Sequence, residues 1–112
     1  MYGQVNESDW KLFRKKLPGW QEAYMAKLVG EYIAMLTGPG QASDKFWNLE
    51  KRIRADKRDT GVIAEMRRSV MDQNIINLLA EGAITLDDLD GFSEELRDRM
   101  TFLMRNHDGT TH

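Results

Sequence analysis

The residue types that carry nucleophilic and metal chemistry are scarce in this 112-residue chain. It contains no cysteine, and its two histidines, His107 and His112, both lie in the last six residues. A Ser-His-Asp or Cys-His triad would therefore have no histidine or thiol in the part of the chain that can form a core. A thiolate zinc site is excluded as well, and we expect no histidine metal site in so short a tail. The sequence predicts no catalytic residue, no metal and no cofactor.

A cluster of carboxylates is the first group that could contact a partner. Its members are Asp87, Asp88, Asp90, Glu94, Glu95 and Asp98. A calcium loop does not fit, because aligning Gly91 with the invariant glycine puts Leu86 at the first ligand position and Arg97 at the twelfth. A DNA-reading helix does not fit either, since these acids would face a polyanion. We therefore treat the six acids as a candidate protein-binding face.

The second candidate surface is a basic stripe that contains one tryptophan. It consists of Trp47, Lys51, Arg54 and Arg58. At about 100° per residue, these positions fall within about 60° of one another on a helix. A tryptophan among three cations can stack on a nucleic-acid base while the cations contact phosphates. The opposing interpretation is that Trp47 widens the contact with the core and the cations are only solvated.

The net charge of −2 conceals two segments of opposite sign. Residues 45–71 contain eight bases and four acids, a net charge of +4, whereas residues 72–112 contain nine acids and three bases, a net charge of −6. Such asymmetry favours two faces with different partners. The alternative is that the segments neutralise each other through surface ion pairs, each worth under about 1 kcal/mol.

The elements that position these candidates are predicted to be helices. Asn6 predicts the N-cap of a first helix, and Pro18 predicts its end, because proline cannot donate the backbone hydrogen bond of a helix interior. The buried stripe of this helix consists of Trp10, Phe13 and Leu17. A second helix over about residues 19–36 is apolar around most of its circumference, as is typical of a central helix. Gly30 within it favours a closely packed neighbouring backbone, since glycine costs up to about 1 kcal/mol relative to alanine there.

Gly38-Pro39-Gly40 predicts a break, after which Ser43 caps a third helix over about residues 44–58. The expected core stripe of this helix consists of Phe46, Leu49 and Ile53. Another helix follows Ser69, with Gly82 at its end and an apolar stripe. That stripe consists of Met71, Ile75, Leu78 and Leu79.

Two capping signals predict the last elements. Thr85 with Asp88 forms a capping box for a short helix near residues 86–90, and Ser93 caps a final helix over about residues 94–105. The buried stripe of the final helix consists of Leu96, Met100, Leu103 and Met104. No stretch alternates with a period of two, so we expect no strand.

These elements predict an all-α fold: a single compact bundle of about four main helices plus one or two short helices. We expect residues 1–112 to form one domain, with residues 1–5 and 106–112 as frayed tails. No apolar run approaches the roughly 18 residues that a membrane span requires. The expectation is therefore a soluble, cytoplasmic protein without a membrane partner.

The sequence also resembles a known family in a set of short motifs. They are Trp10-Lys11-Leu12-Phe13-Arg14-Lys15-Lys16, Trp20-Gln21-Glu22-Ala23-Tyr24-Met25, Glu31-Tyr32, Ser43-Asp44-Lys45-Phe46-Trp47, Leu49-Glu50-Lys51-Arg52-Ile53 and Gly82-Ala83-Ile84. The family comprises small, uncharacterised, all-helical bacterial proteins, some of which carry the label multidrug transporter. That label conflicts with a chain that is 30% charged and has no spanning segment. The resemblance implies one helical domain and no particular chemistry.

The leading hypothesis is a non-enzymatic protein–protein interaction module, acting as an adaptor, regulator or inhibitor. A sharper version is an inhibitor of a nucleic-acid enzyme, of the phage anti-CRISPR type, that occupies a basic groove with the six acids. The alternative is nucleic-acid binding through the basic stripe, and a sensor of a small molecule is a third class. Association with further copies of the chain stays open.

Overall fold

The computed structural model describes residues 5–109, which form four α-helices and two short 3-10 helices without any strand. The elements are α1 (Glu7–Thr37), α2 (Ala42–Asp56), η1 (Arg68–Val70), α3 (Met71–Ala80), η2 (Leu86–Leu89) and α4 (Glu94–Gly109). The predicted all-α bundle of about four main helices plus one or two short helices is confirmed.

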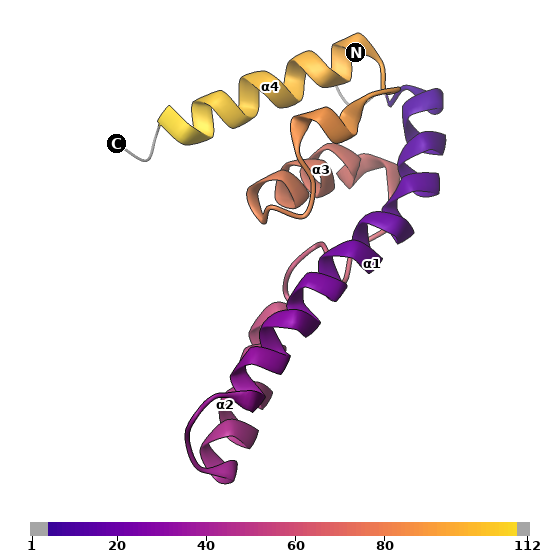
Figure 1. The fold of residues 1–112 in the computed structure, drawn as a ribbon. Coiled ribbons are helices and arrows are strands. Elements are labelled where there is room, and N and C mark those ends of the chain that lie inside the picture. The colour runs from indigo at the N-terminus through magenta and orange to yellow at the C-terminus, as the bar shows by residue number, and fades with distance from the viewer. Residues whose placement is uncertain (1–4, 110–112) are drawn as a thin grey trace.

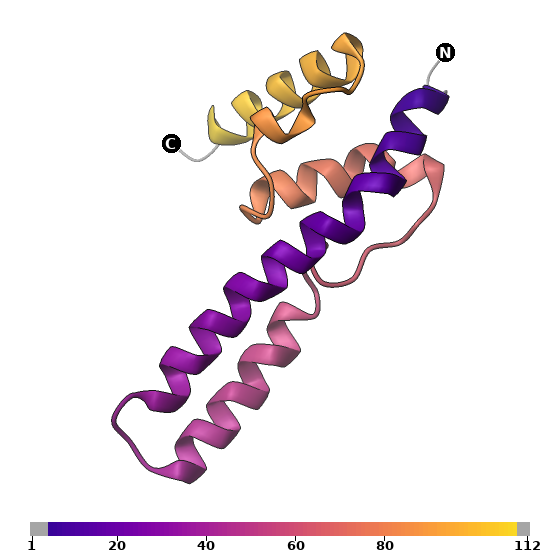
Figure 2. The same cartoon turned by 45° about the vertical axis from the view of Figure 1, so that its right-hand side comes forward.

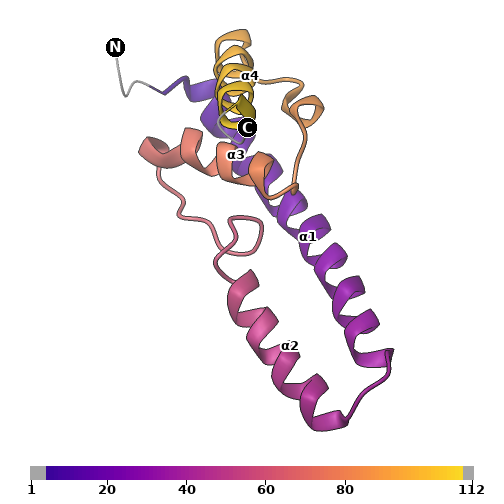
Figure 3. The same cartoon turned by 90° about the vertical axis from the view of Figure 1, so that its left-hand side faces the viewer.

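The helices are arranged as a head and a projecting arm (Figures 1 and 2). We call residues 5–20 together with residues 68–109 the head, and the antiparallel hairpin of residues 25–58 the arm. The principal extents are 56 × 34 × 21 Å, and the radius of gyration is 16.7 Å. A compact globular domain of this length would have a radius of gyration of about 13 Å. The excess reflects the arm, in which α2 lies alongside only the C-terminal half of α1 (Figure 3).

The hydrophobic core lies in the head and joins α1, α3, η2 and α4. Its buried members are Trp10, Phe13, Leu17, Met71, Ile75, Leu78, Leu79, Ile84, Leu89, Phe92, Leu96 and Met100. The apolar stripes predicted for the first helix and for the helix after Ser69 are therefore confirmed. In α4, Leu96 and Met100 are buried and Met104 packs against the core, but Leu103 is exposed.

Pro18 does not end a helix, and the predicted boundary is wrong: α1 continues through it as one helix of 31 residues. A proline in a helix interior costs about 3 kcal/mol, because it removes a hydrogen bond and its ring clashes with the preceding turn. Packing on both sides of the proline offsets this cost. Phe13 and Leu17 are buried before it, and Tyr24 and Leu28 are buried after it.

The prediction of a central second helix is also wrong, because residues 25–37 lie in the arm. Val29, Ile33 and Leu36 are exposed there. Gly30 is exposed too, and outside its own helical turns no heavy atom of the described chain lies within 4 Å of where a Cβ would be. A tight backbone contact therefore does not explain this glycine.

The helix that follows the Gly38-Pro39-Gly40 break departs from prediction in its start and its packing. It begins at Ala42 with Gln41 at the N-cap, which makes no side-chain capping bond, so Ser43 lies inside the first turn. None of its 15 residues, all within the described chain, is buried. Phe46, Leu49 and Ile53 are therefore not a core stripe. Helical spacing revealed the apolar side of α2 but not whether anything covers it.

The capping predictions in the head are confirmed. The Asn6 side chain accepts hydrogen bonds from the backbone N–H groups of Ser8 (2.8 Å) and Asp9 (3.1 Å). Thr85 and Asp88 form the predicted capping box of η2. The C-terminal turn of α3 leads into Gly82, whose φ of +77° is the left-handed conformation that glycine favours.

Ser93 caps α4 as predicted, but with the help of a distant residue. Its Oγ accepts from the backbone N–H of Leu96 at 3.2 Å. The buried carboxylate of Asp9 accepts from both the N–H (2.8 Å) and the Oγ (2.6 Å) of Ser93. Asp9 therefore ties the start of α1 to the start of α4.

The predicted tails lie partly outside the described residues, namely at residues 1–4 and 110–112, which include His112. Between these limits Val5 packs against the core. α4 runs through Gly109, past the predicted end near residue 105. The final helix is thus longer than its apolar stripe.

Candidate functional site

The arm exposes large apolar side chains that the head does not cover. On α2, Phe46 is 62% exposed and Trp47 is 64% exposed, and the two rings meet edge to face with centroids 4.9 Å apart. Ile53 on α2 and Leu36 on α1 are exposed as well. Contiguous apolar surface of this kind marks interaction sites in folded proteins.

A groove of about 640 Å³ runs along this side of the arm. Its lining consists of Leu36, Ala42, Lys45, Phe46, Leu49, Glu50, Ile53, Arg54 and Lys57. Its lining is mostly apolar, and we call its four charged residues, Lys45, Glu50, Arg54 and Lys57, the rim. Ala42, Phe46, Leu49 and Ile53 follow one another at helical spacing, so they form a single stripe along α2.

A smaller cavity of about 180 Å³ continues the apolar surface toward the base of the arm. Ile53 and Lys57 line both cavities, and Tyr32 and Val62 are among the other residues of the smaller one. The apolar side of the arm therefore extends from the tip at Leu36 to the loop after α2.

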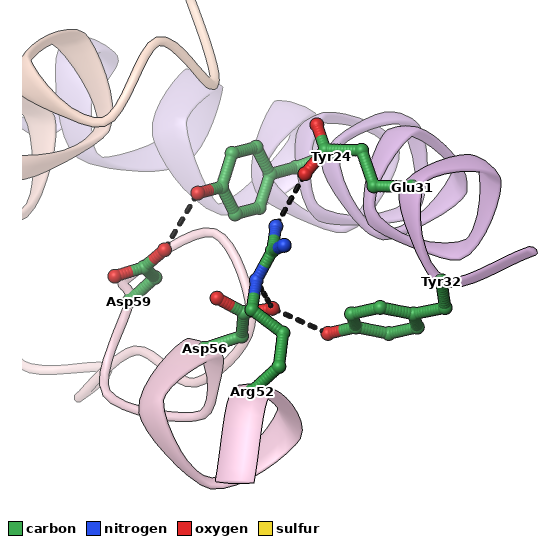
Figure 4. A network of polar contacts seen from close by, with 6 residues as sticks. All are labelled: Tyr24, Glu31, Tyr32, Arg52, Asp56 and Asp59. Atoms are coloured by element: carbon green, nitrogen blue, oxygen red, sulfur yellow. Dashed lines mark hydrogen bonds and ion pairs between the residues drawn. The ribbon is translucent and has the colours of Figure 1, made fainter. Parts of the chain in front are cut away.

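A polar network holds the two helices of the arm together, on the side where they face each other (Figure 4). The Tyr32 hydroxyl donates to Asp56 at 2.5 Å. Arg52 also donates to Asp56, at 2.9 Å, and pairs with Glu31 on α1. Its guanidinium lies over the Tyr32 ring, 5.6 Å from the centroid. These contacts fix α2 against α1 with little help from apolar burial.

A second set of contacts joins the arm to the head at the loop after α2. The Glu81 carboxylate, at the end of α3, accepts from the backbone N–H groups of Thr60 (2.8 Å) and Gly61 (3.0 Å). The Tyr24 hydroxyl donates to Asp59 at 2.6 Å. The Tyr24 ring covers Gly61 so closely that a Cβ there would lie 2.4 Å from its Cδ2 atom. Glycine is thus required at position 61 because any side chain would clash with Tyr24, and not because the backbone adopts a positive φ.

The two tyrosines of these contacts are held in their neutral form. Burial and the hydrogen bond to Asp56 raise the pKa of Tyr32 from 10.0 to about 12. Burial and the hydrogen bond to Asp59 raise the pKa of Tyr24 further still. The hydrogen bond to Glu31 raises the pKa of Arg52, which is charged in any case. A phenol with a raised pKa stays protonated, so it can donate a hydrogen bond between the two helices but is a poor general base.

Three residues of the basic stripe, Trp47, Lys51 and Arg54, lie on α2 on the side away from α1, and Arg58 lies in the turn two residues beyond its end. At about 100° per residue, their positions are rotated by roughly a third of a turn from the apolar stripe. Trp47 does not widen a core contact, since it is exposed. Arg54 pairs with Glu50, whereas Lys51 and Arg58 form no ion pair with any side chain that the structure describes.

The six acids lie on η2, its C-cap residue and α4, all on the head, and each is exposed. Asp88 is occupied by the capping box with Thr85. The other five form no ion pair within the described part of the chain. Asp87 lies in the first turn of η2 and Glu94 and Glu95 lie in the first turn of α4, where helix starts favour anions. Asp90 lies at the C-cap of η2, and Asp98 lies further along α4.

The two oppositely charged segments do not neutralise each other. Six ion pairs occur among the described side chains, and none joins a cation of residues 45–71 to an acid of residues 72–112. The side-chain hydrogen bonds that do join these segments go to or from the backbone: Glu81 accepts from the N–H groups of Thr60 and Gly61, and Asn74 donates to the Glu65 carbonyl. The interpretation that surface pairs cancel the asymmetry is therefore wrong. Of the net charge of +4, residues 45–56 of α2 carry +2 and residues 57–71 after it carry +2, whereas the excess negative charge lies on the head.

The described residues contain no group of three or more His, Asp or Glu side chains placed to hold a metal ion. Across residues 5–109, we find no helix with the length and apolarity that a bilayer span requires.

No family model, no curated protein and no solved structure matches this chain. The resemblance to small helical bacterial proteins therefore stays a prediction.

Sequence reasoning missed the groove, and in particular Leu36, Ala42, Lys45 and Lys57. Two signals in the sequence could have found it. The break at Gly38-Pro39-Gly40 is so short that the flanking helices must lie side by side. The first of them is apolar around most of its circumference, which is more surface than a two-helix hairpin can cover.

Proposed function

We propose that this protein is a non-enzymatic protein-binding module that holds a partner in the groove along α2. The observation that carries the proposal is a helix with aromatic and aliphatic side chains at core spacing and no buried residue. Docking an apolar partner surface would remove Phe46, Leu49 and Ile53 from water. Each fully buried side chain of this size stabilises a complex by about 1.5–3 kcal/mol before the costs of association.

The absence of cysteine and the position of both histidines in the last six residues support a role without catalysis. The titratable groups whose pKa values depart from the usual ones support it too, since Tyr24 and Tyr32 are clamped by carboxylates at the base of the arm. Structural networks of hydrogen bonds and ion pairs shift pKa values in the same way as reaction sites do.

The proposal is tested by affinity purification from a lysate of the native cell, with Phe46→Glu as the variant. Phe102→Glu is the matched control, because Phe102 on α4 is 61% exposed and lies outside the groove. We expect a protein that the wild type and Phe102→Glu retain, that Phe46→Glu loses, and that nuclease does not release. Far-ultraviolet circular dichroism checks that both variants stay folded. If Phe46→Glu retains every partner of the wild type, the groove is not the binding surface.

Nucleic-acid binding through the basic stripe is the second candidate, favoured by an exposed Trp47 beside Lys51 and Arg58. It predicts affinity for single-stranded DNA or RNA that falls steeply between 50 and 200 mM salt. Replacing Lys51 and Arg58 by alanine should weaken that binding. No binding at the lower salt concentration removes this candidate.

The acidic face is a third surface, and the hypothesis of an inhibitor that enters a basic nucleic-acid groove depends on it. Five of its six carboxylates are available to a basic partner. The test is the same purification with these five replaced by their amides, Asp87→Asn, Asp90→Asn, Glu94→Gln, Glu95→Gln and Asp98→Asn. A partner set unchanged by this variant contradicts the hypothesis.

A further inference from the structure

We infer that the groove takes an amphipathic α-helix of a partner protein, with carboxylates beside its apolar stripe. This inference rests on the proposed function and specifies the chemistry of the partner. It follows from the charge of the rim, from the length of the groove and from the surfaces that this chain itself can offer.

The rim of the groove carries an excess of positive charge. Of its charged residues, Glu50 and Arg54 pair with each other. Lys45 and Lys57 remain, near opposite ends of α2, and neither forms an ion pair with a side chain that the structure describes. An occupant with carboxylates near both lysines would be complementary in charge, and such complementarity sets partner choice more than affinity.

The shape of the groove favours a helix. The stripe and rim on α2 run from Ala42 to Lys57, which at 1.5 Å per residue is about 22 Å, the length of a helix of about 15 residues. The backbone N–H and C=O groups of α2 are engaged within the helix, so they offer no edge to an extended peptide. An exposed apolar stripe on a helix instead packs well against a second helix whose apolar residues recur at i, i+3, i+4 and i+7.

A second copy of this chain does not fit the groove as well. In a symmetric pair the same patch faces itself, so the unpaired lysines of one copy would face those of the other. The acidic helix α4 does not supply the occupant either, because Leu96 and Met100 of its apolar stripe are buried in the core. A membrane surface would have to accommodate the Glu50 carboxylate in the lining of the groove, and Trp47, although its ring contacts Phe46, is not among the lining residues.

The test uses two synthetic peptides of about 16 residues, long enough to span the groove. Both carry leucine at i, i+3, i+4 and i+7, one with flanking glutamates and the other with flanking lysines. Fluorescence anisotropy measures their affinity for the wild type and for Lys45→Glu/Lys57→Glu. Lys11→Glu/Lys15→Glu is the matched control, since it reverses two exposed lysines on the head.

We expect the glutamate peptide to bind the wild type and the control with equal affinity, and Lys45→Glu/Lys57→Glu about tenfold more weakly. The lysine peptide should show the opposite preference. The inference is overturned if the two peptides bind the wild type equally, or if the glutamate peptide does not bind. It is also overturned if Phe46→Glu dissolves a dimer of the wild type, or if vesicles of phosphatidylcholine and phosphatidylserine bind in place of the peptide.

These outcomes are distinct from failure of the proposed function. The lysate experiment with Phe46→Glu depends on the groove and not on the charge or the conformation of the partner. A partner lost with Phe46→Glu, together with equal binding of the two peptides, would keep the binding module and reject the acidic helix.

Discussion

The contact between Gly61 and Tyr24 provides the sharpest test of how the arm is joined to the head. In Gly61→Ala the new methyl carbon would lie 2.4 Å from Cδ2 and 2.7 Å from Cγ of the tyrosine ring. Non-bonded carbons prefer about 3.5 Å or more, so something must move by about 1 Å. The ring is 7% exposed and its hydroxyl is bonded to Asp59, while Glu81 holds the backbone of the loop. Neither side of the contact is free to retreat.

The magnitude follows from these constraints. Overpacking costs about 1–3 kcal/mol, and the loss of one hydrogen bond of the clamp adds about 1 kcal/mol. We therefore expect Gly61→Ala to lower the free energy of unfolding by about 2–4 kcal/mol. With an unfolding entropy of about 2.1 cal/mol/K per residue, the melting temperature falls by about 9–17 °C.

Urea denaturation followed by circular dichroism measures this loss, and the same substitution at Gly30 is the control. No described atom outside its own helix lies within 4 Å of a Cβ at Gly30. Gly30→Ala should therefore raise the free energy of unfolding by up to about 1 kcal/mol. In a Tyr24→Ala background, the cost of Gly61→Ala should disappear. A Gly61→Ala protein within about 0.5 kcal/mol of the wild type would refute the contact.

Three further predictions concern the head, the arm and the helix that joins them. Asp9→Ala should lower the free energy of unfolding by about 2–4 kcal/mol in urea, because Ser93 loses a buried charged acceptor; Asp9→Asn should cost less. Pro18→Ala should raise the melting temperature, because alanine restores a helical hydrogen bond and removes the ring clash, which together cost up to about 3 kcal/mol. An unchanged melting temperature contradicts this. Tyr32→Phe should be less stable than the wild type by a constant amount below pH 10, the ordinary pKa of tyrosine. Because the folded protein raises that pKa to about 12, the difference should shrink as the pH rises through that value, and a difference independent of pH contradicts the bond to Asp56.

Capping chemistry made the head predictable from the sequence. Asn6, Thr85 and Ser93 act within three residues of their own positions, so local sequence suffices to identify them. The buried stripe of Trp10, Phe13 and Leu17 was also readable, because its spacing matches the helical period. What could not be read locally is that Asp9 serves a helix start 84 residues away.

The arm was not predictable by the same means. The spacing of Phe46, Leu49 and Ile53 shows that they share one side of a helix, but the same spacing serves a core and a binding groove. Pro18 led to a wrong prediction of a helix end. Its local cost is offset because residues of α1 on both sides of it are buried against segments far along the chain. Trp47, Lys51 and Arg54 lie on the predicted helix, but Arg58 lies beyond its end and Asp90 lies at the C-cap of η2. How far apart the acidic and basic residues lie depends on the tertiary fold, which local sequence does not specify.

The continuity of α1 has a mechanical consequence. One helix of 31 residues, about 46 Å long, is shared by the head core and the wall of the groove, so it acts as a rod between them. A rod of this kind bends only where its internal hydrogen bonds are missing, and Pro18 leaves the Arg14 carbonyl without its usual donor. That turn lies beside Phe13 and Leu17, which are buried in the head core, and Glu81 holds the loop after α2 against the end of α3. A partner held in the groove would therefore be kept at a fixed distance from the head, because α1 and the loop after α2 both connect the two parts.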